Sequence, residues 1–208
     1  MINVCVPVLK RYDLLRDLVA SLPSGVMLHI INNGRDAARL SAALAGREAH
    51  VLTPPDPMGV AESWNWFLAN VPEERVIVND DVTFAPDSLA KLLAPKTDMT
   101  FAQGIGFSCF VIRNRAVKRI GVFDESISPG YAYYEDDDYM ARMRRGGVSA
   151  TDVVDSGIVH LRSSTLEKNT EAEMQEHHRR FHIARANFVE KWGMMPGDLR
   201  TADEASQR

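Results

Sequence analysis

The chain has 208 residues, of which 45% are hydrophobic and 25% charged, and its formal net charge is −4. That length suits one well-buried α/β domain, and the acidic balance argues against binding to nucleic acid through overall charge alone. The two cysteines, Cys5 and Cys109, sit in apolar runs, which predicts buried thiols in a reducing compartment. No apolar run reaches the ~18 residues of a membrane span, and no basic segment precedes the first apolar stretch, so we expect a cytoplasmic protein.

Apolar runs and amphipathic segments alternate in the first half of the chain, which predicts a mostly parallel sheet with helices on both faces. The expected strands are 2–9, 26–31, 50–52 and 76–78, and the expected helices between them are 14–22, 36–44 and 60–68. Ligands of such sheets bind beyond the carboxyl ends of the strands. We therefore expect one crevice to be surrounded by Pro7, Asn32, Asn33, Asp80 and Asp81.

The second half of the chain is less regular, and its periodicity predicts two strands and three helices. The strands are expected over 107–112 and 153–159, and the helices over 115–120, 135–145 and 174–192. The polar segment 163–169 is expected to be mobile, and the residues after Gly197 are expected to fray.

The sequence Asn79-Asp80-Asp81 directly follows a predicted buried strand. It is a good turn sequence, so an ordinary turn is one interpretation. The other is a site for a divalent cation, because Mg²⁺ and Mn²⁺ prefer one or two carboxylates together with phosphate oxygens. Only one of the two aspartates need contact the cation.

A second acidic cluster, 135–138, opens the predicted helix 135–145. Carboxylates at a helix N-terminus interact well with the helix dipole, which explains the cluster without any catalytic role. Helical spacing also predicts that Asp136 shares an inward-facing stripe with Tyr139, Met140 and Met143, whereas Asp137 faces water. A partly desolvated carboxylate has the raised pKa that a general base requires.

His160 ends the predicted strand 153–159 and precedes a polar loop. A single histidine is more often structural, but this setting also suits a ligand of Mn²⁺. The last predicted helix carries basic side chains that form either a solvated face or a groove for an anionic acceptor. They are His177, His178, Arg179, Arg180, His182 and Arg185.

The order of these motifs over residues 4–193 resembles that of the family 2-like inverting glycosyltransferases with the GT-A fold. The most specific stretch is Gly-Val-Phe-Asp-Glu at 121–125, followed by Tyr-Glu-Asp-Asp-Asp at 134–138 and Arg142. Further matching pieces are Val-Pro-Val at 6–8, Ile-Ile-Asn-Asn-Gly at 30–34, Gly-Val-Ala at 59–61 with Asn65, Asn-Asp-Asp-Val at 79–82, Val-His at 159–160 and Phe-Val-Glu-Lys-Trp-Gly at 188–193.

The resemblance implies that Asp81 and His160 hold Mn²⁺ or Mg²⁺ and that the pair Glu135 and Asp136 supplies the base, with Asp136 taking the proton. The donor is expected to be a nucleotide-diphosphate sugar, with a UDP-sugar foremost. Its expected contacts are Pro7, Asn32, Asn33, Asn65 and Asp80. Two positions depart from the family, since Asn32 and Asn79 stand where aspartate is usual.

Together these observations predict a single α/β GT-A domain over residues 1–197, with a Rossmann-like nucleotide-sugar half at 1–82 and an acceptor half at 83–197. Residues 198–208 are expected to be a flexible tail. The predicted activity moves a hexose or pentose to a hydroxyl of a glycan or polysaccharide precursor, or of a hydroxymethylated DNA base, while 163–169 closes over the donor. Nucleotidyl transfer and non-catalytic binding of a nucleotide sugar remain alternatives.

Overall fold

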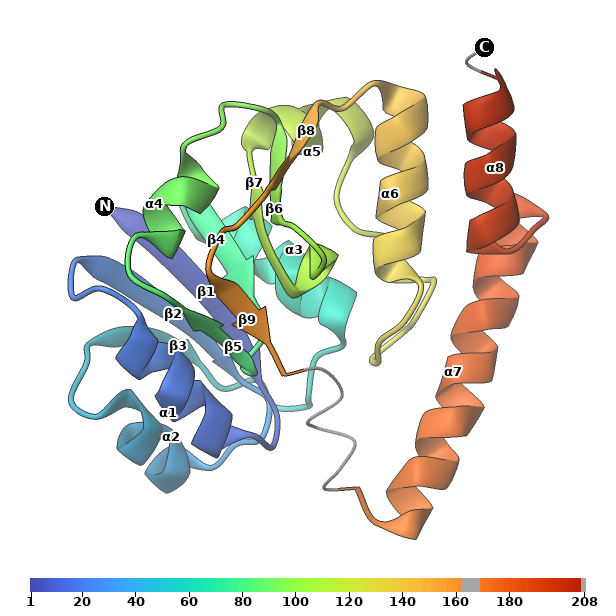
Figure 1. Ribbon diagram of the computed structural model, residues 1–208. Helices are drawn as coiled ribbons and strands as arrows, with labels where there is room; N and C mark the ends of the chain where they lie inside the picture. The colour runs from blue at the N-terminus through green and yellow to red at the C-terminus, as the bar shows by residue number, and fades with distance from the viewer. Residues whose placement is uncertain (162–168, 207–208) are drawn as a thin grey trace.

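The computed structural model describes residues 1–161 and 169–206, and it contains a seven-stranded sheet, a two-stranded sheet and helices around them (Figure 1). The strands are β1 (Ile2–Val8), β2 (Val26–Asn32), β3 (Ala49–Leu52), β4 (Arg75–Val78), β5 (Val82–Phe84), β6 (Met99–Ala102), β7 (Cys109–Ile112), β8 (Ala150–Val153) and β9 (Ile158–His160). The helices are α1 (Tyr12–Ser21), α2 (Ala37–Leu44), α3 (Val60–Asn70), α4 (Ser88–Leu93), α5 (Asn114–Ile120), α6 (Glu135–Gly146), α7 (Glu171–Trp192) and α8 (Pro196–Ser206), with a 3₁₀ turn η1 (Gly106–Ser108).

The main sheet has the strand order β3-β2-β1-β4-β7-β6-β8. β1 pairs in parallel with β2 and β4, and β2 pairs in parallel with β3, so these four strands end at one edge of the sheet. β7 runs antiparallel to β4 and β6, whereas β8 runs parallel to β6. The prediction of an α/β fold with a mostly parallel sheet is confirmed.

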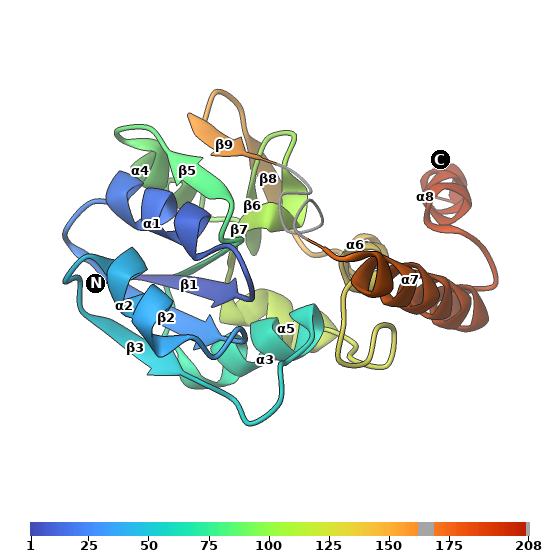
Figure 2. The ribbon, with the colours of Figure 1, turned by 90° about the horizontal axis from the view of Figure 1, so that it is seen from below.

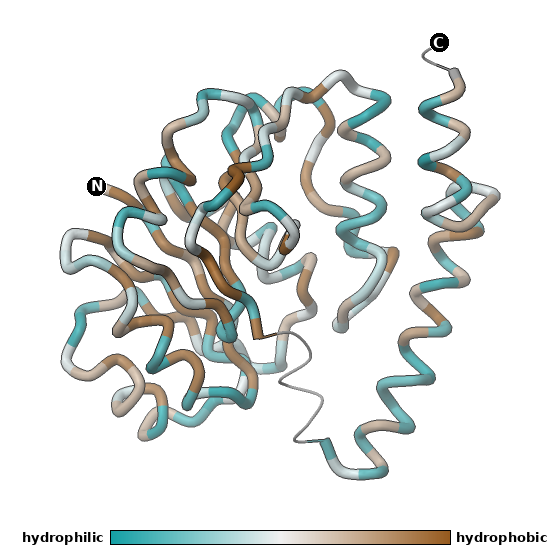
Figure 3. Tube along the Cα trace, viewed as in Figure 1, coloured by the Kyte–Doolittle hydropathy of each residue, from teal (hydrophilic) through white to brown (hydrophobic). Residues whose placement is uncertain are grey.

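Two hydrophobic cores lie on opposite faces of this sheet. Val4 and Val6 of β1 belong to the core that includes residues of α1, α2 and α4, whereas Cys5 belongs to the core that includes residues of α3, α5 and α6. Strands buried on both faces read as continuous apolar runs, and Figure 3 shows them as the hydrophobic centre of the molecule. Cys5 and Cys109 are buried free thiols, as predicted, and burial raises the pKa of both.

The chain between the two predicted acidic motifs contains three elements that the sequence did not reveal, namely β5, α4 and β6. The predicted strand 153–159 is wrong, because β8 ends at Val153 and β9 begins at Ile158. Asp155 and Gly157, at φ +50° and +72°, turn the chain between them. β8 therefore joins the main sheet, while β9 pairs with β5. The predicted strand 107–112 likewise begins only at Cys109, after η1.

The polar segment after Gly197, expected to fray, forms α8. One apolar side chain, Leu199, is buried against Ala141 and Phe188, and the buried Asp203 accepts hydrogen bonds from Arg144 and Arg145 of α6. These contacts hold the helix although its composition is polar. Within the described residues no helix combines the length and the apolar character that crossing a bilayer requires.

The long helix α7 is fastened to α6 through a buried carboxylate. Asp138 is 0% exposed and accepts hydrogen bonds from Arg142 at 2.9 Å and from the Trp192 indole at 2.9 Å. Lys191 lies 2.6 Å from the same carboxylate and also contacts Asp124 at 2.6 Å. A buried charge is tolerated when it is paired in this way, and removing one partner leaves the others uncompensated.

We therefore expect Asp138→Ala to lower the free energy of unfolding by about 3–5 kcal/mol, because it leaves Arg142 and the Trp192 indole without the buried acceptor that they share. Asp124→Ala is the matched control. It removes a carboxylate that also binds Lys191 but is partly solvated, so about 1 kcal/mol or less is expected. Urea unfolding monitored by tryptophan fluorescence measures both, and equal losses would refute this account of Asp138.

Candidate active site

The carboxyl end of β4 carries the first acidic motif. Asp80 and Asp81 are both buried at this edge of the sheet, directly before β5. Because β5 pairs antiparallel with β9, Val82 lies opposite His160. This pairing brings the His160 Nε2 atom to 3.1 Å from the Asp81 Oδ1 atom. Two residues that the sequence singled out separately are therefore in contact.

A carboxylate oxygen and an imidazole nitrogen are ligands that suit Mn²⁺, and Mg²⁺ uses carboxylates with phosphate oxygens. No cluster of three or more metal-binding side chains occurs in the described part of the chain. The Asp81–His160 pair thus fits a cation that completes its coordination with substrate phosphates rather than a closed structural site. Burial, and then the neighbouring Asp81 charge, raise the pKa of Asp80 to about 8.

Arg11 and Asp13 lie close enough to Asp80 to affect its pKa. Arg11, which follows β1 and is buried, exerts an opposing electrostatic effect on Asp80 and forms an ion pair with Asp13 at 2.9 Å. The sequence did not single out Arg11, because the segment 9–12 lacks the glycines of a phosphate-binding loop. A single arginine after the first strand was the signal that could have found it.

The two asparagines at the end of β2 are buried, as the crevice prediction requires. Their oxygens are occupied within the protein, since Asn32 accepts a hydrogen bond from the Tyr12 hydroxyl and Asn33 accepts one from the Met58 amide at 2.9 Å. At Gly34 a Cβ atom would overlap the Leu9 carbonyl oxygen, so only glycine lets these two strand exits approach so closely. The asparagines therefore hold the crevice walls together.

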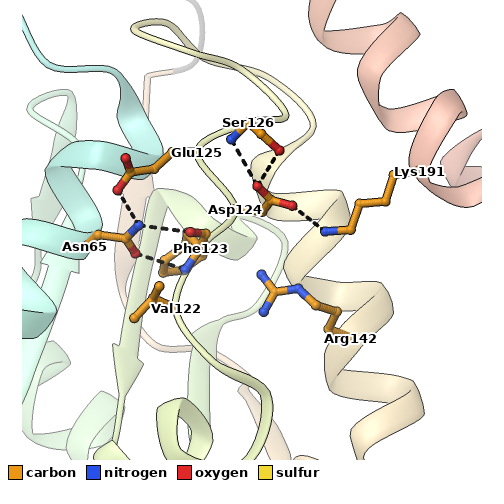
Figure 4. Close-up of a pocket in the computed structure, with 8 residues that line it drawn as sticks. All are labelled: Asn65, Val122, Phe123, Asp124, Glu125, Ser126, Arg142 and Lys191. Carbon is orange, nitrogen blue, oxygen red and sulfur yellow. Dashed lines mark hydrogen bonds and ion pairs between the residues drawn. The ribbon is translucent and has the colours of Figure 1, made fainter.

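Pro7 is half-buried on β1 and lies opposite Ile31 of β2. Asn65, predicted to contact the donor, makes other contacts. Its amide nitrogen donates to the Phe123 carbonyl at 2.9 Å and to Glu125 at 2.7 Å, and its oxygen accepts from the Phe123 amide at 2.9 Å (Figure 4). It anchors the segment 121–125 beside a depression of about 490 Å³. This geometry favours a role for Asn65 in holding the segment 121–125 rather than in binding the donor.

The second acidic motif begins α6, and its predicted orientation needs correction. Met140, placed in the inward stripe, is 38% exposed, whereas Glu135 at 4% and Asp138 at 0% are the buried acids. Asp136 and Asp137 are both half-buried, so Asp137 does not simply face water. The predicted orientation of α6 is wrong because it assumed that apolar residues mark the buried face. The buried face of α6 includes two acids, and the flexible Met140 side chain tolerates exposure.

Burial governs the acidity of the whole motif. Burial, and then the Asp136 charge, raise the pKa of Glu135 to about 8, and the Glu135 Oε2 atom has no hydrogen-bond partner among the described residues. Burial raises the pKa of Asp136, whose carboxylate accepts a hydrogen bond from the Asp137 amide at 2.9 Å. Burial and the Asp136 charge raise the pKa of Asp137 to about 6. Carboxyls perturbed in this way cluster at functional sites.

The segment predicted to close over the donor, 163–169, lies outside the described residues except for Asn169. Asn169 and Glu173 both accept hydrogen bonds from Lys10, which follows β1. The start of α7 is therefore held close to the carboxyl end of β1, at the predicted crevice. Figure 2 shows α7 beside the 121–134 loop, on the far side of that loop from α3.

Comparisons with protein-family models and with characterised proteins find no match to the sequence. Solved structures do match the fold. S. aureus TarS 1-349 in complex with UDP-GlcNAc is similar over 90% of this chain and 66% of its own length, with a TM-score of 0.59 and 11% identity. A Drosophila β1,4-galactosyltransferase 7 mutant in complex with manganese, UDP-Gal and xylobiose is similar over 83% of this chain and 78% of its own, with a TM-score of 0.53 and 14% identity.

This chain has a GT-A fold. A second structure of TarS 1-349, with a TM-score of 0.53 and 13% identity, matches 68% of this chain and 54% of its own length, so the chain spans about half to two thirds of that segment. At such low identity the likeness establishes the architecture, and the GT-A fold predicted from the motif order is confirmed by it. The chemistry of this chain has to be argued from its own site.

The buried Glu135 generates a prediction about stability. Its pKa is about 8 in the folded protein and 4.5 ordinarily, so between these pH values the folded state holds a proton that the unfolded chain has released. Stability therefore falls as the pH rises through this window. Glu135→Gln cannot ionise, and we expect it to raise Tm at pH 8 by about 3 °C or more, with a smaller gain at pH 5.

Calorimetry at the two pH values measures this difference. Glu190→Gln, on the exposed side of α7, is the matched control and should leave Tm unchanged at both. A Glu135→Gln variant with the same pH dependence as the wild type would show that Glu135 is not held protonated.

Proposed function

We propose that the protein is a metal-dependent inverting glycosyltransferase that moves a sugar from a UDP-sugar, or a related nucleotide-diphosphate sugar, to an acceptor hydroxyl. The observation that carries the proposal is the contact between Asp81 and His160 at the carboxyl end of β4, beside the buried Asp80. Carboxylate and imidazole ligands at a strand exit suit a cation that binds a diphosphate. The GT-A architecture supports the same reading.

Asp81 and His160 would hold Mn²⁺ or Mg²⁺, which supplies Lewis-acid stabilisation of the charge on a departing diphosphate. The nucleoside would lie against the strand exits that carry Pro7, Asn32 and Asn33. Their internal hydrogen bonds keep these walls fixed before a donor binds, and fixed geometry lowers the ordering cost of binding.

Asp136 would accept the proton of the attacking acceptor hydroxyl, with the buried Glu135 as its neighbour in the first turn of α6. Burial raises the pKa of Asp136, which increases its strength as a base relative to a solvated aspartate. A single displacement assisted by one base inverts the configuration of the transferred sugar. Glu135, protonated through most of the neutral range, would limit the negative charge beside that base.

The metal role is tested by thermal shift with UDP. We expect UDP to raise Tm much more with Mn²⁺ or Mg²⁺ than with EDTA, because a ligand that binds the folded state stabilises it. Asp81→Asn should abolish that difference, because it removes a ligand of the cation. Asp152→Asn, an exposed acid on β8, is the control and should behave as the wild type. Equal stabilisation in EDTA would remove the cation from the mechanism.

The base is tested by comparing transfer rates. Asp136→Asn keeps the shape of the side chain but cannot take a proton, so we expect transfer to fall by about 10²–10⁴-fold with little change in donor affinity. Asp137→Asn should remain within a few-fold of the wild type. The measurement is release of UDP from a donor sugar in the presence of an acceptor, together with donor affinity by calorimetry.

If Asp137→Asn is inactive while Asp136→Asn remains active, the general base is Asp137 and not Asp136. If donor binds but no variant and no acceptor gives turnover, the protein is a nucleotide-sugar-binding module. Release of pyrophosphate from a nucleoside triphosphate that is supplied together with a sugar phosphate would identify nucleotidyl transfer.

A further inference from the structure

Three tyrosines stand in the segment directly before α6, at Tyr131, Tyr133 and Tyr134, and all three are half-buried. Tyr134 packs against the small core formed by Ala141, Phe188 and Leu199. Tyr131 and Tyr133 belong to none of the hydrophobic cores. The two rings therefore pack outside the hydrophobic cores of the described residues.

Contacts place Tyr131 at the wall of the crevice. The Tyr131 carbonyl accepts a hydrogen bond from the Val60 amide at 2.7 Å, and a Cβ atom on Gly59 would lie 2.6 Å from the Tyr131 nitrogen. The preceding residue, Met58, donates to Asn33 at the end of β2. Only glycine allows this close approach, so the start of α3 holds the tyrosine segment against the proposed nucleoside pocket.

On the opposite side α7 fixes the orientation of the two rings. Tyr133 meets the His177 and Phe181 rings edge-on, with centroids 5.3 and 5.1 Å apart. The Tyr131 hydroxyl shares a hydrogen bond with His177 Nδ1 at 3.2 Å, and Arg180 lies over the Tyr131 ring at 5.3 Å. The rings are thus pre-oriented, which is what an aromatic binding surface requires.

The backbone at this point is strained. Tyr133 and Tyr134 have φ angles of +92° and +68°, a left-handed region that non-glycine residues rarely adopt. Such conformations persist only where the surroundings impose them, and they concentrate at ligand-binding and catalytic positions. Here the strained pair immediately precedes Glu135 and Asp136, so the rings and the proposed base are positioned by one turn of the chain.

The charges around the rings do not favour a polyanion. Lys10 pairs with Glu173, and both Arg179 and Arg180 pair with Glu176, at 2.7 and 2.6 Å. The basic face that the sequence suggested on α7 is therefore partly neutralised beside the tyrosines, where one glutamate is paired with two arginines. Asp136 and Asp137 lie in the first turn of α6, and their carboxylates would repel a phosphate backbone.

We propose that Tyr131 and Tyr133 form the acceptor-binding platform, and that its ligand is a neutral saccharide whose ring packs against the tyrosine rings with its hydroxyl directed to Asp136. Small-molecule sites are lined mainly by hydrophobic and aromatic side chains, with a few polar groups that fix the orientation of the ligand. The inference rests on the proposed glycosyl transfer, since it names the acceptor of that same site.

The test uses the full chain and a panel of neutral trisaccharides, namely cellotriose, maltotriose, chitotriose and mannotriose, with a hydroxymethylcytosine duplex as the competing arm. Saturation-transfer NMR detects binding with and without UDP and Mg²⁺. We expect at least one trisaccharide to bind, and Tyr133→Ala to weaken it by roughly 3–10-fold, the range typical of one aromatic contact. The matched variant Tyr133→Phe keeps the ring and should bind as the wild type does.

Ring-labelled tyrosine in the wild-type protein gives a second readout that does not depend on a variant folding, since the Tyr131 and Tyr133 resonances should shift on saccharide addition. Binding of the duplex in place of every trisaccharide, absence of any trisaccharide binding, or binding that Tyr133→Ala leaves intact would overturn the inference. Loss of UDP binding in the wild type would instead overturn the proposed function, and the measurement without UDP keeps the two failures apart.

Discussion

The antiparallel pairing of β5 with β9 is the constraint on which the candidate site depends. Ile158 and His160 face the same side of this small sheet, and Ile158 is buried in the core that also contains Val82 and Phe84. A shift of one residue in register would expose Ile158 and turn the imidazole away from Asp81. The burial of a few apolar side chains therefore fixes a contact between two polar ones.

Three buried carboxyls, Asp138, Asp80 and Glu135, differ in how far neighbouring groups compensate their charge. Asp138 is surrounded by Arg142, Lys191 and Trp192, so its charge is compensated and it holds α7 in place. Asp80 and Glu135 lack comparable compensation, and burial raises the pKa of each to about 8. The two carboxyls whose pKa is raised lie at the carboxyl end of β4 and at the start of α6, where the donor and the acceptor are proposed to bind.

The first half of the fold was predictable because β1, β2 and β4 are buried on both faces and read as continuous apolar runs. Asp81 and His160 were found from motif order, although nothing local to either residue indicates that they meet. The orientation of α6 was not predictable from hydrophobic pattern, because its buried face includes Glu135 and Asp138. The turn between β8 and β9 was hidden in an apolar segment, and α8 depends on tertiary contacts of Leu199 and Asp203 that no local pattern shows.

α7 connects the two ends of the proposed site. Near its start, Glu173 binds Lys10 at the exit of β1, and near its end Lys191 binds Asp124 and Asp138. Between these points its side chains hold the tyrosine segment that leads into Glu135 and Asp136. α7 follows both elements in sequence, and it thus helps to fix the start of α6 relative to the strand ends where the donor is proposed to bind. Since misplacement by about 1 Å can slow group transfer strongly, the contacts that dock α7 matter to the proposed mechanism as well as to the fold.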